Sequence, residues 1–122
     1  FDVAYYSLLI HVPLHPKNLR ERGFNQSVIL AKEISKRFHI PLDFLTLRRH
    51  SYTEAQINLG RKDRETNVKG VFSVTDTAKI DGQRIILVDD VYTSGSTVKE
   101  CTRVLLQSKA ESVAILTLAR AV

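Results

Sequence analysis

The chain has 122 residues, of which 43% are hydrophobic and 25% charged, values that favour one globular domain and exclude a disordered or fibrous chain. A single cysteine excludes an internal disulfide and a cysteine zinc cluster, so we expect a cytoplasmic protein; no apolar run approaches the roughly 20 residues of a membrane helix. The net charge of +5 suits a phosphate-bearing partner, nucleic acid or simply a soluble surface. Because the chain contains no Met, we expect it to begin inside a longer protein.

The first half of the chain predicts a buried strand, a helix and a second strand. Residues 7–13 form a short apolar run that ends in proline, which is typical of a strand buried on both faces. Apolar residues at spacings of three and four over 23–38 predict a helix, and another apolar segment follows at 42–47. The polar, basic stretch 48–69 has too few apolar residues to join a core, so we expect a mobile loop there.

The second half alternates strands and a helix. Residues 71–75 alternate like a half-exposed strand, and Asp81-Gly82 supplies the turn into 84–88, the strongest buried-strand pattern of the chain. A helical stripe follows, made of Val98, Cys101, Leu105 and Leu106. A final buried strand occupies 113–118. This order predicts an α/β fold in which helices flank a single open, mainly parallel sheet that carries a flexible loop.

The segment 85–97 carries the chemistry, because a buried strand there runs into two acids, a loop of small residues and a helix. Ligands of open α/β sheets bind beyond the carboxyl ends of the strands, where a helix N-terminus offers free N–H groups. We therefore predict an anion site in the loop formed by Thr93, Ser94, Gly95, Ser96 and Thr97. Capping of the helix by Ser96 or Thr97 with Glu100 is an additional expectation that leaves the two acids unexplained.

Asp89 and Asp90 are the two acids at the end of this strand. In a regular strand they point to opposite faces, so we expect the chain to leave the strand between them. Carboxylates are acceptors that suit a sugar diol or Mg²⁺, and a diol beside a phosphate site predicts a ribose 5-phosphate ligand. A receiver-like phosphoacceptor pocket is excluded by position, and the mononucleotide and dinucleotide glycine motifs are absent.

The segment 85–97 resembles the phosphoribosyl pyrophosphate (PRPP) signature of type I phosphoribosyltransferases, and the rest of the chain resembles the ComF competence-protein family. The matching motifs are Val12-Pro13-Leu14-His15-Pro16, Arg20-Glu21-Arg22-Gly23-Phe24-Asn25-Gln26, Thr53-x-x-Gln56 and Arg64-x-x-Asn67-Val68-x-Gly70-x-Phe72. The chain departs from the family pattern where His11 and Asn18 replace Pro and Arg, and where Ser94 replaces the usual Thr.

The resemblance implies a type I phosphoribosyltransferase domain over 1–122 and assigns roles to particular residues. Asp89 and Asp90 become the catalytic pair that holds the ribose hydroxyls, and the loop from Thr93 to Thr97 takes the 5-phosphate. The implied pyrophosphate loop consists of Val12, Pro13, Leu14 and His15. The implied accessory residues are Arg20, Arg22, Asn25, Gln26, Arg64 and Asn67. The stretch 48–70 falls where these enzymes carry the flexible loop that closes over the site.

The activity implied by the resemblance is Mg²⁺-dependent transfer of a phosphoribosyl group from PRPP to a nitrogenous acceptor. Mg²⁺ is expected through PRPP, with no direct metal ligand from the protein. Relatives carry an N-terminal cysteine-rich zinc module that has no match here, so we expect a fragment. The alternative is a non-catalytic PRPP-sensing or single-stranded-DNA module that works with a DNA-uptake machinery.

The remaining candidate residues have simpler expectations. His11 and His15 are separated by a proline and form no metal pair on one helical face. His39 and His50 are expected at the surface without partners, and Cys101 is expected in the core rather than as a nucleophile. Tyr92 is equally suited to stacking on a base and to packing in a turn. The basic and amide residues from Arg20 to Gln26 can bind pyrophosphate or cap and solvate the helix.

Overall fold

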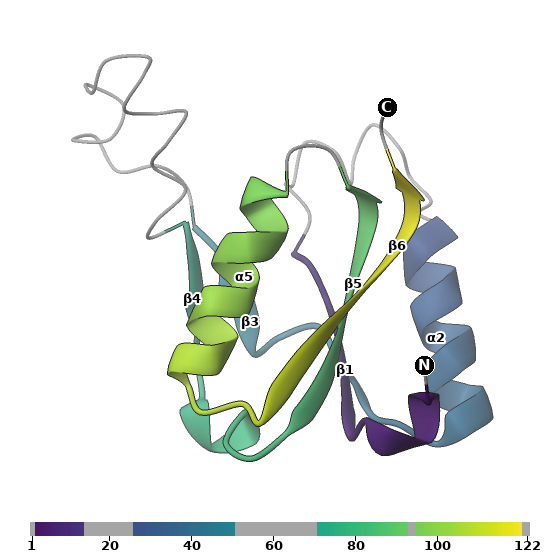
Figure 1. Cartoon of the computed structure of the whole chain (residues 1–122), viewed down its shortest axis with the longest axis horizontal. Coiled ribbons are helices and arrows are strands. Elements are labelled where there is room, and N and C mark those ends of the chain that lie inside the picture. Colours follow the sequence, from purple (N-terminus) through teal and green to yellow (C-terminus); the bar gives the residue numbers. More distant parts are fainter. Residues whose placement is uncertain (1, 14–25, 51–70, 93–94, 121–122) are drawn as a thin grey trace.

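The computed structural model describes residues 2–13, 26–50, 71–92 and 95–120 of the chain. Figure 1 shows its elements, which are η1 (Val3–Tyr5), β1 (Leu8–His11), α2 (Gln26–Phe38), β2 (Leu42–Asp43), β3 (Leu47–Arg49), β4 (Phe72–Val74), η2 (Thr77–Lys79), β5 (Arg84–Tyr92), α5 (Ser96–Gln107) and β6 (Ser112–Arg120). Each segment predicted to be regular structure overlaps a strand or helix. The start of the predicted helix, 23–25, lies outside the described residues.

The four strands β2, β1, β5 and β6 form the central sheet in that order, and all of them are parallel. Leu8 pairs with Ile85 of β5, and the pairing of β5 with β6 begins at Arg84 and Ser112. Strands β1, β5 and most of β6 are rich in Leu, Ile and Val, as expected for strands with helices on both faces. The predicted α/β fold with a mainly parallel sheet is confirmed.

The apolar segment 42–47 forms two short strands rather than one. The carboxylate of Asp43 accepts hydrogen bonds from the backbone N–H groups of Leu45 and Thr46, at 2.7 and 2.9 Å, and from the Thr46 hydroxyl at 2.5 Å. These bonds turn the chain after β2, as Asx turns do. Strand β3 then leaves the central sheet and pairs antiparallel with β4, so a separate two-stranded sheet is present.

The central sheet is covered on both faces, as Figure 1 shows, with α2 on one side and α5 together with β3 and β4 on the other. Alternate residues of β5 divide between these layers. Ile85 and Leu87 belong to the buried cluster that includes Val98 and Leu105 of α5. Ile86 and Val88 belong to the cluster with Ala31 of α2 and Leu9 of β1.

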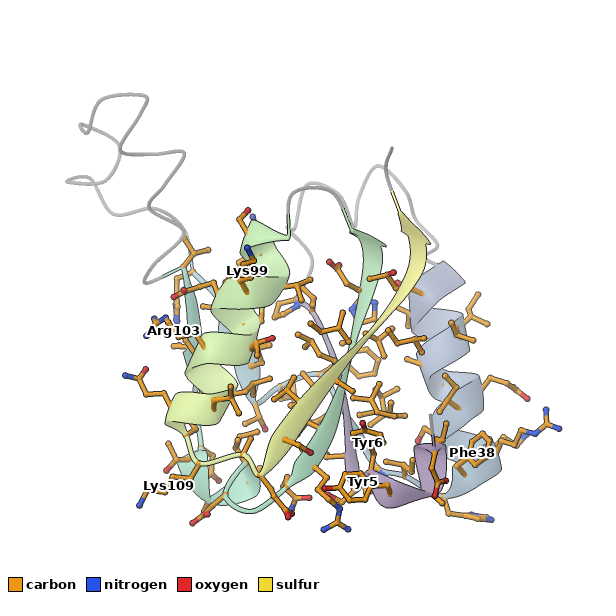
Figure 2. The ribbon with its side chains drawn as sticks, viewed as in Figure 1. Tyr5, Tyr6, Phe38, Lys99, Arg103 and Lys109 are labelled. Carbon is orange, nitrogen blue, oxygen red and sulfur yellow. The ribbon has the colours of Figure 1, made fainter. Side chains whose placement is uncertain are left out.

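Two apolar residues assigned to helix stripes lie outside the core. Phe38 is the last residue of α2, and its side chain is 45% exposed at the end of the helix (Figure 2). Leu106 is 48% exposed because Leu105, one position earlier, takes the core-facing place together with Cys101. Adjacent helical residues differ by about 100° around the axis, so both leucines cannot face the sheet. None of the helices that the structure describes is long and apolar enough to cross a membrane.

Candidate functional site

The carboxyl ends of β1, β5 and β6 lie together at one edge of the central sheet. The backbone N–H of Val12, just past β1, donates to the carbonyl of Val88 in β5 at 2.8 Å. The next residue of β5, Asp89, pairs with Thr117 of β6. Val12, Asp89 and Thr117 are therefore neighbours across three strands, at the edge where open parallel sheets bind their ligands.

Asp89 and Asp90 both belong to β5, which continues to Tyr92. The expectation that the chain leaves the strand between them is wrong, because β6 holds β5 in register as far as the pair of Tyr92 and Arg120. Asp89 is half-buried and follows Leu87 by two positions, so it lies on the face of the sheet covered by α5. The side chains of Asp90 and Tyr92 lie outside the described part of the structure.

Three residues separate the end of β5 from the start of helix α5, which lies close to the carboxyl edge of the sheet (Figure 1). Gly95 is its N-cap and adopts a left-handed conformation with φ 81° and ψ −2°. The N–H of Lys99 donates to the Gly95 carbonyl at 2.8 Å, and Gly95, as the N-cap, has no side chain with which to cap the helix. The N–H groups of the first turn, which includes Ser96 and Thr97, are thus placed to receive an anion.

The predicted capping of α5 by Ser96 or Thr97 is wrong, because both residues lie inside the helix that Gly95 precedes. Glu100, the expected partner of that cap, is almost fully buried and accepts hydrogen bonds from Arg103 at 2.6 and 2.9 Å. A carboxylate buried beside the core needs such a bidentate partner, since an unpaired buried charge is costly.

His11 also lies at this edge, and the sequence predicts no functional role for it. It is the last residue of β1 and is only 4% exposed, with its Nδ1 at 2.7 Å from the Val12 carbonyl oxygen and its Nε2 at 2.7 Å from the Ser27 hydroxyl oxygen. Ser27 lies in the first turn of α2 and is fully buried. The signal for His11 was its place at the end of an apolar run, but no local pattern indicates Ser27 as its partner.

Cys101 is fully buried in α5, as predicted for a core residue. Burial raises the pKa of its thiol to about 12, the nearby negative charges of Asp89 and Glu100 add to this rise, and Arg49 opposes it. A thiol with this pKa carries almost no thiolate at neutral pH and is therefore unsuited to nucleophilic catalysis.

Arg48 and Arg49 belong to β3, so the predicted mobile loop begins later than residue 48. Arg49 lies over the ring of Phe72 in the partner strand, with its Cζ at 5.4 Å from the ring centroid, a cation–π contact. His50 is exposed as expected, but its Nε2 is hydrogen-bonded to the Ser73 hydroxyl, so the expectation that it lacks a partner is wrong. His39 is exposed, as predicted.

Many of the predicted site residues lie outside the described residues, and nothing in the structure places them. They are Leu14, His15, Arg20, Arg22, Asn25, Arg64, Asn67, Thr93 and Ser94, together with residues 51–70 of the predicted loop. Gln26 begins α2, but its side chain is not described. The structure brings together Val12, Pro13, Asp89 and the Gly95–Thr97 turn at one edge, and these four features define the candidate site.

Comparison with known proteins assigns the fold. The phosphoribosyl transferase domain family matches residues 25–121. The chain belongs to this family. A solved member, the purine phosphoribosyltransferase from Pyrococcus horikoshii, superposes with a TM-score of 0.61 at 19% identity, over 97% of this chain and 65% of that one. The phosphoribosyltransferase fold expected from the sequence is therefore confirmed.

Curated relatives of this phosphoribosyltransferase domain include competence proteins. Competence protein F of Haemophilus influenzae is 35% identical over 114 residues, which are 93% of this chain and 50% of the relative. Competence protein ComFC of Bacillus subtilis is 34% identical over 114 residues, which are 93% of this chain and 44% of the relative. The resemblance to the ComF proteins is thus confirmed, and the chain spans about half the length of the curated relatives it matches.

Proposed function

We propose that the protein binds PRPP at the carboxyl edge of the central sheet and transfers the 5-phosphoribosyl group to a nitrogenous acceptor. The acceptor nitrogen forms a bond to the anomeric carbon of the ribose, while the bond from this carbon to the pyrophosphate oxygen breaks. The electron pair of the broken bond leaves with pyrophosphate, and the acceptor loses a proton to solvent. The observation that carries the proposal is the meeting of Val12, Asp89 and the start of α5 at this edge, in a chain of the phosphoribosyltransferase family.

Each described feature of the candidate site has a distinct part in this proposal. The first turn of α5, opened by the left-handed Gly95, offers backbone N–H groups to the 5-phosphate, and the hydroxyls of Ser96 and Thr97 lie on the same turn. Asp89 accepts hydrogen bonds from the ribose hydroxyls. Val12 and Pro13 lie one strand away, where the proposal puts the pyrophosphate end. Positioning and electrostatic stabilisation then supply most of the catalysis, since pyrophosphate is a good leaving group.

The Mg²⁺ implied by the resemblance is an ion that the phosphates of the substrate can carry. Across residues 2–13, 26–50, 71–92 and 95–120, no group of three or more His, Cys, Asp or Glu side chains could hold a metal ion. Protein-bound Mg²⁺ commonly has one or two carboxylates and otherwise substrate phosphates and water as ligands. We therefore propose that PRPP carries Mg²⁺ into the site. When bound, the ion neutralises charge on the leaving pyrophosphate.

Calorimetric titration with PRPP in the presence of Mg²⁺ tests the binding half of the proposal. We expect the wild-type protein to bind with a micromolar Kd, and the double variant Asp89→Asn, Asp90→Asn to bind at least about tenfold more weakly, because charge-assisted hydrogen bonds to the diol are lost. Asp81→Asn is the matched control, since Asp81 is an exposed carboxylate at the other edge of the sheet, before β5. Equal affinities for the wild type and the double variant contradict the assigned diol role.

Pyrophosphate release tests the transfer half. The wild-type protein, PRPP and Mg²⁺ are incubated with each member of a panel of nitrogenous bases, and released pyrophosphate is measured. We expect release that depends on one class of base and that falls by at least about a hundredfold in the double variant. Binding of PRPP without base-dependent release across the panel favours the non-catalytic alternative.

That alternative is a module that senses PRPP or associates with single-stranded DNA. The relatives named competence proteins favour it, as do the exposed Arg48 and Arg49 on β3. A strand-tracking surface needs basic residues combined with exposed aromatic platforms. Among the described arginines, Arg49 already lies over Phe72, which is itself buried, so this pair offers no free stacking face.

A further inference from the structure

The imidazole of His11 uses both of its nitrogens although it is almost fully buried. Nδ1 lies 2.7 Å from the carbonyl oxygen of Val12, and Nε2 lies 2.7 Å from the hydroxyl oxygen of Ser27. The ring of Phe44 is a neighbour of the His11 ring, with the two ring centroids 6.3 Å apart. A buried ring nitrogen without a partner is costly, so the two hydrogen bonds together hold the ring in one orientation.

The hydrogen-bond partners determine the tautomer of His11. A carbonyl oxygen can only accept, so Nδ1 carries a proton and donates it to Val12. The ring is only 4% exposed, and loss of hydration destabilises a charged ring there, which favours a neutral imidazole. In the neutral ring Nε2 has no proton, and it therefore accepts the hydrogen bond that the Ser27 hydroxyl donates.

This pair of bonds fixes the backbone at the end of β1. The N–H of Val12 is already bonded to the Val88 carbonyl in β5, and its carbonyl is bonded to His11, so both backbone polar groups of Val12 have defined partners. Ser27 in turn belongs to the first turn of α2. A single side chain thus joins the end of β1 to the start of α2, across 16 positions of sequence.

We propose that His11 is a positioning residue that orients the Val12–Pro13 backbone toward the pyrophosphate end of PRPP. This inference rests on the proposed function. The proposal predicts different effects on PRPP and on ribose 5-phosphate, which share the ribose and the 5-phosphate, because only PRPP carries the pyrophosphate group. Loss of the His11 bonds weakens PRPP binding while leaving ribose 5-phosphate binding nearly unchanged.

Calorimetry with PRPP and Mg²⁺, and separately with ribose 5-phosphate, tests this separation on three variants. His11→Phe keeps an aromatic ring and removes both bonds, and we expect about a tenfold loss for PRPP with less than about a twofold change for ribose 5-phosphate. Ser27→Ala keeps the Val12 bond and is expected to cause a smaller loss, about threefold, for PRPP alone. His39→Asn is the control, because His39 is exposed at the far end of α2 with φ 55°, a conformation that Asn tolerates.

An equal loss of affinity for both ligands in His11→Phe overturns the positioning role and leaves a purely structural one. Unchanged affinity for PRPP overturns it as well. Side-chain ¹⁵N NMR of the wild-type protein provides a readout that needs neither variant nor ligand: the Nδ1–H tautomer supports the arrangement, and the Nε2–H tautomer overturns it. Failure of the wild-type protein to bind either ligand overturns the proposed function, and the ligand half of this inference with it. In that case the tautomer of His11 still tests the arrangement of its hydrogen bonds, because the NMR measurement does not depend on ligand binding.

Discussion

At the scale of one residue, hydrogen bonds outweigh burial in their effect on the pKa of the Asp43 carboxyl. Burial alone raises the pKa of its carboxyl, but the hydrogen bonds from the Thr46 side chain and from the backbone of Thr46 and Leu45, with the charge of Lys79, lower it below its ordinary value. The ionised form is therefore the one that holds the turn between β2 and β3. Because this turn sends β3 out of the central sheet, one carboxylate determines where a strand is placed.

Asp43→Asn is expected to lower the free energy of unfolding by about 1 kcal/mol at pH 7, since a charge-assisted acceptor at a partly exposed site is lost. The folded pKa is depressed, so the stabilisation is fully present above the unfolded pKa of about 3.8 and disappears as the pH falls through the folded value. Urea unfolding at a series of pH values between 7 and 2.5 measures this. Asp81→Asn, on an exposed turn, is the control, and an Asp43→Asn deficit that grows toward low pH contradicts the assignment.

The start of α5 shows at the scale of an element how backbone conformation prepares a binding turn. Two glycines of the described chain have positive φ, Gly82 at 73° and Gly95 at 81°. Gly82 lies in the turn before β5, at the amino edge of the sheet, and a Cβ added there meets nothing within 4 Å. Gly95 lies at the carboxyl edge and caps α5. The two positions therefore impose the same backbone strain on any other residue but differ in their distance from the candidate site.

Gly95→Ala and Gly82→Ala form a matched pair. Each is expected to lower the free energy of unfolding by about 1 kcal/mol, because an L side chain pays roughly this amount for a left-handed conformation. Only Gly95→Ala is expected to weaken ribose 5-phosphate binding, by about tenfold, because it disturbs the N–H groups that face the phosphate. Thermal unfolding and calorimetry measure the two effects. Loss of binding in both variants, or in neither, contradicts the role of the α5 turn.

At the scale of the whole molecule, the positive charge has two competing explanations. The net charge of +5 belongs to a chain in which exposed Arg48 and Arg49 lie on β3, in the two-stranded sheet rather than the central one. A small polyanion needs a few of these charges near one site. Single-stranded DNA needs a longer track and releases counterions from each phosphate that it contacts.

The salt dependence of DNA binding distinguishes these explanations. For the proposed transferase we expect weak binding of single-stranded DNA and competition by PRPP. The slope of log affinity against log salt is expected to be about −0.7 for each phosphate contact, with only about one or two contacts in total. Fluorescence anisotropy with a labelled oligonucleotide, over a series of salt concentrations from about 50 to about 300 mM, measures the slope. The variant Arg48→Ala, Arg49→Ala is compared with Lys32→Ala, Lys36→Ala, which removes two exposed lysines of α2. Tight DNA binding that PRPP does not affect contradicts the transferase proposal and supports the DNA-binding module.

The class of fold, and the edge of the sheet at which the candidate site is expected, follow from the sequence alone. Continuous apolar runs at 7–13 and 84–88, with a helical period between and after them, suffice to predict buried parallel strands covered by helices. Because ligands of such sheets bind at the carboxyl ends of the strands, the acids after residue 88 also identify the edge. The core position of Cys101 follows in the same way from its place in an apolar stripe.

Where each element ends, and which side chains meet, depends on tertiary contacts. Pairing with β6 extends β5 through Asp89 and Asp90, the Asp43 turn divides 42–47 between two sheets, and α5 begins after a left-handed Gly95. His11 meets Ser27 only because α2 packs on β1. The physical reason is that a local pattern shows which side of an element is apolar, whereas strand register, turn hydrogen bonds and buried polar pairs depend on groups supplied by distant parts of the chain.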